Sequence, residues 1–145
     1  MNHSGVIDLV PGEVRSRWSE KGIYPVKSLY ELFCEQAWRH PDSPAVISLD
    51  RTVSYIALLN KVQRLASSLK ALGIVAGDVI AYQLPNSWHS CAIDLAAAAL
   101  GAIVAPFPPG RGRLDIQSLL RRCDARVMIV ERKYAGVDLC ELIDS

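Results

Sequence analysis

Apolar residues recur every three or four positions over residues 55–72, which predicts a helix with one buried face. Gly73 directly follows this series and predicts where the helix ends. A second helix is predicted over residues 29–39, because Ser28 and Glu31 form a capping box at its start. The apolar members of the first helix, which we expect in the core, are Tyr55, Leu58, Leu59, Val62, Leu65, Ala66, Leu69 and Leu72.

Short apolar runs between the helices predict strands. Residues 78–84, 102–105 and 126–131 form three such runs, and residues 102–105 are too apolar for a solvated sheet edge. We expect the three strands to be parallel neighbours, since one helix joins each strand to the next. The connecting segments are the helices 88–100 and 114–123 and the loop 106–113.

The remaining pattern completes an α/β fold. Residues 45–49 and 52–54 predict a small hairpin, and residues 133–143 predict a last helix. Helices and strands alternate from Ser54 onward. This order favours a three-layer α/β fold with a mostly parallel sheet and helices on both faces.

The chain has 145 residues, the length of a single domain, which we divide into two parts. Residues 1–24 lack sustained periodicity and predict an extended arm, and residues 25–145 form the α/β body. The side chains expected to anchor the arm on the body are Trp18, Ile23 and Tyr24.

Composition argues against several classes of protein. Sixteen Lys+Arg against 15 Asp+Glu leave a net charge of +1, so no electrostatic reason exists to expect nucleic acid. The most apolar stretch, residues 95–107, is shorter than the roughly 20 residues of a membrane span. Residues 1–13 lack the pattern of a signal peptide, so we expect a cytoplasmic protein that does not bind a membrane.

The cysteines lack metal-ligand spacing and are expected to be reduced core residues: Cys34, Cys91, Cys123 and Cys140.

The usual catalytic signatures are absent from the sequence. It contains no G-x-S-x-G, no H-E-x-x-H, no G-x-x-x-x-G-K-[ST] and no G-x-G-x-x-G motif. We therefore predict no catalytic residue and no metal ligand. His40, at the end of the helix 29–39, is predicted to be a C-terminal cap, because a cation suits the helix dipole there.

The Gly-Arg-Gly-Arg segment at residues 110–113 is a candidate anion site. Gly110 permits close backbone approach, Arg111 and Arg113 supply guanidinium groups, and the helix that follows favours an anion at its start. A phosphate group or a coenzyme is the ligand that such a site would bind. The alternative interpretation, which we favour, is that these residues form a solvated loop without a ligand. A solvated helix face likewise accounts for the wider basic cluster of Arg111, Arg113, Arg121, Arg122 and Arg126.

His89 is a candidate substrate contact. It lies in the first turn of a predicted helix that Ser87 caps and that follows the strand 78–84. Helices that begin just beyond the carboxyl end of a strand often border a ligand crevice. A structural role is the favoured alternative, since no neighbouring Ser, Cys or Asp forms a triad with His89 in the sequence.

Five segments follow one another in an order known from one superfamily. Residues 52–58 look like the motif T-Y-x-E-L, with Ser54 at the Thr position and Ala57 where Glu is usual. The other segments are residues 40–46 (h-P-d-x-x-A-v), 71–81 (A-L-G-v-x-x-G-D-r-V-a), 83–87 (q-L-P-N-s) and 100–106 (a-G-A-v-x-x-P). Together they resemble the start of the adenylate-forming ligases, which include acyl- and aryl-CoA synthetases, firefly luciferase and peptide-synthetase adenylation domains.

The resemblance covers residues 28–131 and implies the N-terminal subdomain of the acyl-CoA synthetase-like fold. Residues 18–24 look more like the alicyclic, aryl or medium-chain acyl-CoA ligases than the amino-acid-activating branch. In such a parent enzyme a carboxylate attacks ATP with the help of Mg²⁺, and coenzyme A then displaces AMP. The resemblance also implies that the loop with Gly110, Arg111 and Arg113 lies near the path of coenzyme A.

The family's phosphate loop, its ribose-binding acidic residue and its catalytic lysine come after the segments present here. The resemblance therefore implies a chain that is inactive alone, binds none of the cofactors by itself and has the remainder of the ligase as its partner. Its carboxylic acid stays unnamed, because the family's pocket is built mostly from later residues. The alternative is a self-sufficient α/β module that binds a partner or a nucleotide without catalysis. A subdomain cut from its enzyme would expose apolar surface and form a homodimer through it.

Overall fold

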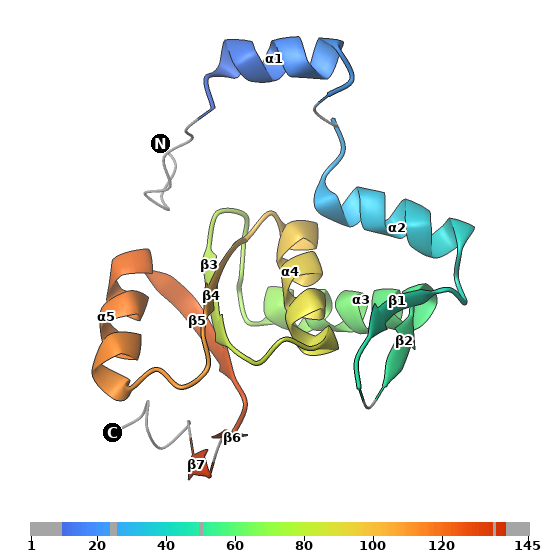
Figure 1. Ribbon diagram of the computed structural model, residues 1–145. Coiled ribbons are helices and arrows are strands. Elements are labelled where there is room, and N and C mark those ends of the chain that lie inside the picture. The colour runs from blue at the N-terminus through green and yellow to red at the C-terminus, as the bar shows by residue number, and fades with distance from the viewer. Residues whose placement is uncertain (1–9, 24–25, 50, 135, 139–145) are drawn as a thin grey trace.

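The computed structural model describes residues 10–23, 26–49, 51–134 and 136–138, and Figure 1 shows how the elements are arranged. The helices are α1 (Gly12–Glu20), α2 (Leu29–Arg39), α3 (Tyr55–Ala71), α4 (Trp88–Leu100) and α5 (Arg113–Cys123). The strands are β1 (Pro44–Ile47), β2 (Thr52–Ser54), β3 (Val79–Gln83), β4 (Ile103–Phe107), β5 (Ala125–Val130), β6 (Lys133–Tyr134) and β7 (Val137–Asp138).

Strand β3 lies in the middle of a three-stranded parallel sheet with the order β4-β3-β5. In the register of this sheet Ile80 lies opposite Val104 on one side and Val127 on the other. The predicted parallel direction is therefore confirmed. The expectation that all three strands are mutual neighbours is wrong for β4 and β5, because β3 separates them.

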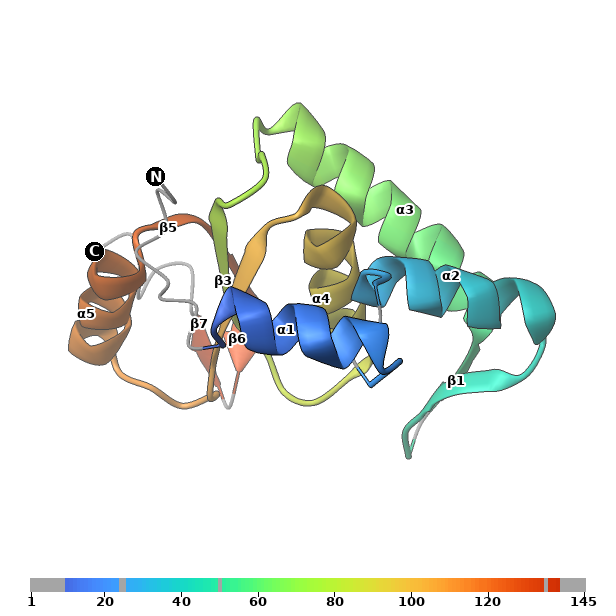
Figure 2. The same ribbon diagram turned by 90° about the horizontal axis from the view of Figure 1, so that it is seen from above.

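The order of the strands explains the three layers. The chain steps from β3 to β4 in one direction and then returns past β3 to β5 in the other. Right-handed crossovers in opposite directions place their helices on opposite faces of the sheet. Figure 2 shows α5 on one side of the sheet and α4, with α3 against it, on the other. The predicted α/β class is confirmed.

The core lies between the sheet and the helices α2, α3 and α4. Helix α3 packs mainly against α4, and four members of the 55–72 series are buried: Leu58, Leu59, Val62 and Leu69. Leu72, at the end of α3, is 70% exposed and does not belong to the core. The buried core cluster consists of Phe33, Ala37, Val53, Leu58, Leu59, Val62, Leu69, Ile74, Ile80, Tyr82, Ala92, Ile93, Leu95, Ala96 and Ala97.

The predicted helix boundaries follow local signals. Ser28 Oγ accepts a hydrogen bond from the Glu31 backbone N–H at 3.2 Å, and the Glu31 carboxylate accepts one from the Ser28 backbone at 2.7 Å. His40 is the C-cap of α2, as predicted. Gly101 ends α4 with φ +68°, a conformation that favours glycine.

The hairpin β1–β2 is antiparallel as predicted, and Asp50 of its turn lies outside the described residues. Strand β4 differs from expectation, because it forms an edge of the described sheet and most of its side chains are only half-buried. Pro106 has no N–H to donate to a further strand, and proline in a sheet favours edge strands.

The arm predicted to be extended contains the helix α1. The prediction was wrong because only Val14 and Trp18 supply an apolar helical spacing, while local contacts hold the helix. Arg15 donates a hydrogen bond to the Val10 carbonyl at 3.0 Å, and the Ile23 N–H donates to the Trp18 carbonyl at 2.8 Å. The helix buries no residue, and the expected anchor Ile23 is 66% exposed. Tyr24, the third expected anchor, lies outside the described residues.

The last helix predicted over residues 133–143 is wrong for its described part. Strands β6 and β7 pair antiparallel there, with Lys133 opposite Asp138. Gly136 between them has φ +82°, a left-handed conformation that a right-handed helix excludes. Residues 139–143 lie outside the described residues.

Two expectations from composition concern the core and the membrane. Cys34, Cys91 and Cys123 are free thiols, but they are half-buried and not fully buried in the core, and Cys140 lies outside the described residues. In the part of the chain that the structure describes, every helix is too short or too polar to cross a membrane.

Candidate functional site

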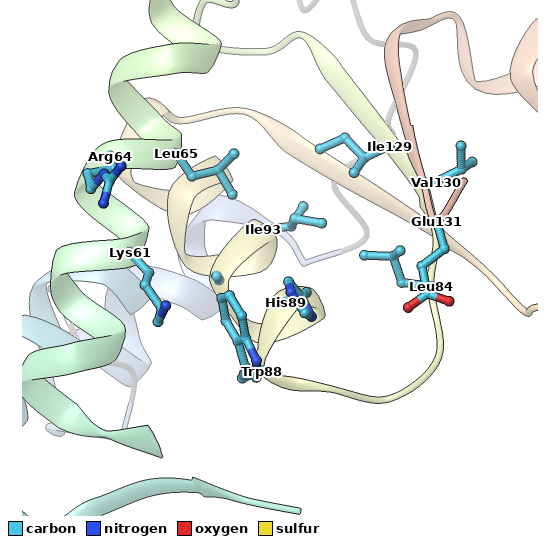
Figure 3. Close-up of a pocket in the computed structure, with 11 residues that line it drawn as sticks. Lys61, Arg64, Leu65, Leu84, Trp88, His89, Ile93, Ile129, Val130 and Glu131 are labelled. Atoms are coloured by element: carbon cyan, nitrogen blue, oxygen red, sulfur yellow. The ribbon is translucent and has the colours of Figure 1, made fainter. Parts of the chain in front are cut away.

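A cavity of about 500 Å³ opens between α3, the start of α4 and the end of β5. Figure 3 shows Lys61 and Arg64 of α3 on one side and Glu131, directly after β5, on the other. Its apolar side chains are Leu65, Leu84, Ala92, Ile93, Ile129 and Val130. The cavity therefore lies at the carboxyl ends of β3 and β5, the edge of a parallel sheet where ligands commonly bind.

Three side chains at the cavity form a stack. Trp88 lies between the Lys61 ammonium group, 4.3 Å from the centre of the indole, and the His89 ring, whose centroid is 3.6 Å away (Figure 3). The His89 Nδ1 atom is 3.4 Å from Ser87 Oγ. The stack holds a cation and an imidazole at the mouth of an apolar cavity.

Local sequence explains how these groups meet. Ser90 Oγ accepts a hydrogen bond from the Ser87 N–H at 3.3 Å and donates one to the Ser87 carbonyl at 2.7 Å. This turn starts α4 and sets the direction of Trp88 and His89. Helix α3 packs along α4 and brings Lys61 over the indole.

The structure places His89 in the wall of the cavity, where its role as a substrate contact stays a prediction. Sequence reasoning missed Lys61 and Trp88. A signal for Lys61 was present, because it lies three residues after Leu58 and four before Leu65, on the apolar face of its helix.

A second hollow of about 670 Å³ lies between β1, α4 and the loop after β4. Tyr82 donates a hydrogen bond to Asp94 Oδ1 at 3.0 Å across its floor. Desolvation, together with the hydrogen bond to Asp94 and the charge of that carboxylate, raises the pKa of Tyr82 to about 12. Desolvation also raises the pKa of Asp94, and the hydrogen bond from Tyr82 opposes that shift. The other side chains that line this hollow are mainly apolar or carry a hydroxyl group.

Gln83 connects the ends of two strands. Its side chain is 1% exposed, and its Nε2 donates a hydrogen bond to the Pro108 carbonyl at 3.0 Å. The Gln83 Oε1 atom is buried without a hydrogen-bond partner in the described structure. This contact positions the loop that follows β4 relative to β3.

The loop with Gly110, Arg111 and Arg113 lies at the same edge of the sheet but outside both hollows. Gly110 has φ +84° and open space where a side chain would be. Arg111 is 3.8 Å from Asp115 in an exposed ion pair, and Arg113 is the first residue of α5. The structure thus brings the three residues together near a helix start and leaves their contact with a coenzyme a prediction.

Comparison with known proteins shows the family. Residues 33–144 match the AMP-binding enzymes, so the chain belongs to that family of adenylate-forming enzymes. The resemblance drawn from the sequence motifs is confirmed.

Individual relatives define the match further. The chain is similar to Protein Y of Streptomyces griseus, with 34% identity over 110 residues, 75% of this chain and 36% of the relative. It is similar to medium-chain fatty-acid–CoA ligase of Escherichia coli K12, with 30% identity over 130 residues, 89% of this chain and 23% of the relative. Among solved structures it is similar to NpsA-ThdA of Klebsiella oxytoca, an artificially fused adenylation–PCP di-domain, with a TM-score of 0.70 and 26% identity. That match covers 80% of this chain and 22% of the other, so the chain spans only a minor part of each of these relatives.

Proposed function

We propose that the chain is the N-terminal part of a ligase that joins a carboxylic acid to the thiol of coenzyme A through an acyl-adenylate. In this reaction the carboxylate attacks the α-phosphate of ATP, pyrophosphate leaves, and the thiol then displaces AMP. The observation that carries the proposal is the match of residues 33–144 to the AMP-binding enzymes. Similarity to a fatty-acid–CoA ligase supports coenzyme A as the thiol.

A carrier-protein thiol is the second candidate acceptor. The similarity to an adenylation domain fused to a PCP favours it. The two candidates differ in one assay on the longer protein, since only a CoA ligase releases an acyl-CoA when free coenzyme A is the sole thiol.

We propose that these 145 residues alone do not activate carboxylates. Adenylation needs donors for a triphosphate, a metal site and a cation aligned together. The described residues contain no group of three or more His, Cys, Asp or Glu that would hold a metal ion. No step through a metal ion is assigned to this part of the protein.

We propose that the loop after β4 contacts one phosphate of coenzyme A. Open space at Gly110 and the guanidinium groups of Arg111 and Arg113 suit a single anionic group at the start of α5. In the longer protein, Arg111→Ala and Arg113→Ala should raise the KM for coenzyme A more than the KM for ATP. The matched control is Arg121→Ala on the exposed part of α5, which should leave both values unchanged.

His89 is proposed to contact the acid, since it lines a largely apolar cavity. His89→Gln in the longer protein should raise the KM for the acid and leave the KM for ATP unchanged. An equal rise in both would instead indicate a structural role for the stack with Trp88.

The decisive test is carboxylate-dependent exchange of labelled pyrophosphate into ATP. We expect no exchange from the chain alone, none from the downstream part of a matching ligase alone, and exchange from their mixture. Exchange by the chain alone would refute its inactivity. Absence of exchange in a mixture that forms a stable complex would favour the non-catalytic binding module.

A homodimer through exposed apolar side chains is part of the proposal. Trp38 and Ile47 are more than two-thirds exposed at 70% and 74%. Light scattering on the purified chain should show twice the monomer mass, and a monomer at high concentration would refute the dimer.

A further inference from the structure

Lys61 is a cation on an apolar helix face. It lies between Leu58 and Leu65 on the side of α3 that packs on α4, and it is half-buried. Its ammonium group contacts the face of Trp88 at 4.3 Å. Burial of a charge costs free energy, and a cation–π contact offsets only part of that cost. A nearby anion would therefore stabilise this lysine.

No described residue supplies that anion. Neither Lys61 nor Arg64, which lies nearly one turn further along α3, forms an ion pair with a described residue. Glu131, on the opposite wall, also has no ion-pair partner among the described residues. The positive charges of Lys61 and Arg64 therefore attract an anion toward α3, and the negative charge of Glu131 repels it from the end of β5.

The body of such an anion would contact an apolar surface. The side chains between the charged walls include four aliphatic ones, Leu65, Leu84, Ile93 and Ile129, beside the rings of Trp88 and His89 (Figure 3). The cavity volume of about 500 Å³ lies within the range of small-molecule sites. Few polar groups on a mainly apolar wall are typical of such sites.

We propose that this cavity binds a small amphipathic organic anion. Its charged head contacts Lys61 and Arg64, and its aliphatic body lies along Leu65 and Ile93. The site shares the cavity wall with His89, but its ligand need not be a carboxylate. The proposal does not rest on ligase activity, because the residues that carry it all belong to this chain.

The probe for this site is heptane-1-sulfonate, an anion that a carboxylate-activating enzyme cannot adenylate. Trp18→Phe with Trp38→Phe leaves Trp88 as the one tryptophan, so its emission reports contact in the cavity. We expect a saturable change in emission with the sulfonate. Heptan-1-ol and heptylammonium, which share the body but lack the negative charge, should bind at least fivefold more weakly.

Isothermal titration calorimetry on the full chain then assigns the charge contacts. Lys61→Met and Arg64→Gln should each weaken sulfonate binding about five- to tenfold, as loss of a charge-assisted contact at a partly exposed site does. Glu131→Gln should strengthen binding, since it removes a like charge. The matched control is Lys70→Met at the exposed end of α3, which should leave binding unchanged.

Three results would overturn the proposal: no saturable binding of the sulfonate, equal affinity for the alcohol and the sulfonate, or equal affinities of the Lys61→Met and Lys70→Met proteins. Circular dichroism of each variant shows whether it is folded before titration. Pyrophosphate exchange is read separately in the mixed protein, so failure of this binding site and failure of the ligase proposal are distinguishable.

Discussion

Ile80 lies in β3, the central strand of the sheet, and its side chain is 0% exposed. Ile80→Ala removes carbon atoms worth about 2.4 kcal/mol of transfer free energy at ~0.8 kcal/mol each. The cavity left between the sheet and its helices adds to this loss, so we expect a total of about 3.5 kcal/mol. Val104 and Val127 on the neighbouring strands restrict collapse into the space, because β3 is hydrogen-bonded on both sides.

Urea unfolding followed by circular dichroism measures this loss. With an m-value of about 2 kcal/mol/M, the midpoint should fall by roughly 1.7 M. The matched control is Val75→Ala in the loop before β3, where the side chain is 61% exposed, and its expected cost is about 0.5 kcal/mol. If Ile80→Ala does not fold, Ile80→Val should still cost about 1 kcal/mol. Equal midpoints for the Ile80→Ala and Val75→Ala proteins would refute the assignment of β3 to the centre of the core.

Three further changes test local features. Asp94→Asn should stabilise the protein at pH 7, because desolvation raises the pKa of Asp94 and the folded state therefore favours the neutral carboxyl. The neutral Asp94 carboxyl costs the folded protein no stability at low pH, and the cost appears as the pH rises through its folded pKa. The stability gained by Asp94→Asn should therefore shrink as the pH falls toward 3.8, the ordinary pKa of an aspartate. A gain that does not change with pH would contradict this. Ser28→Ala should cost about 1 kcal/mol in urea unfolding through loss of the capping box, and an unchanged midpoint would show that α2 does not depend on it. Gly101→Ala should cost at least about 1 kcal/mol, because φ is +68° and a new Cβ would lie 3.1 Å from Ala76 Cβ; a thermal midpoint at or above that of the parent protein would contradict the strain.

Long amphipathic helices and their ends were predictable from the sequence. The capping box at Ser28 and the glycines at the ends of α3 and α4 act through neighbours within one or two turns, so their effect is visible in a short window of sequence. The parallel direction of β3, β4 and β5 was predictable for a similar reason, since a single helix between two strands leaves few other connections.

The failed predictions have weak local signals. Helix α1 buries no residue, so no apolar stripe marked it in the sequence. The β6–β7 hairpin has strands of two residues each, too short for an alternating pattern, and only the left-handed Gly136 distinguishes it from a helix. Strand β4 is apolar enough for a central position, yet its pairing depends on which strand lies beside it.

The features of the candidate site also fall into two groups, those that the sequence predicts and those that depend on the tertiary structure. The sequence by itself determined the class of fold, most helix ends, the family motifs and the position of His89 at the start of a helix beyond a strand, because each of these depends on residues close together in the chain. Only the tertiary structure decided that Lys61 lies over Trp88 and that Glu131 faces them across a cavity. These groups come from α3, α4 and the end of β5, and their distances depend on helix packing and strand order, which no local pattern of residues encodes.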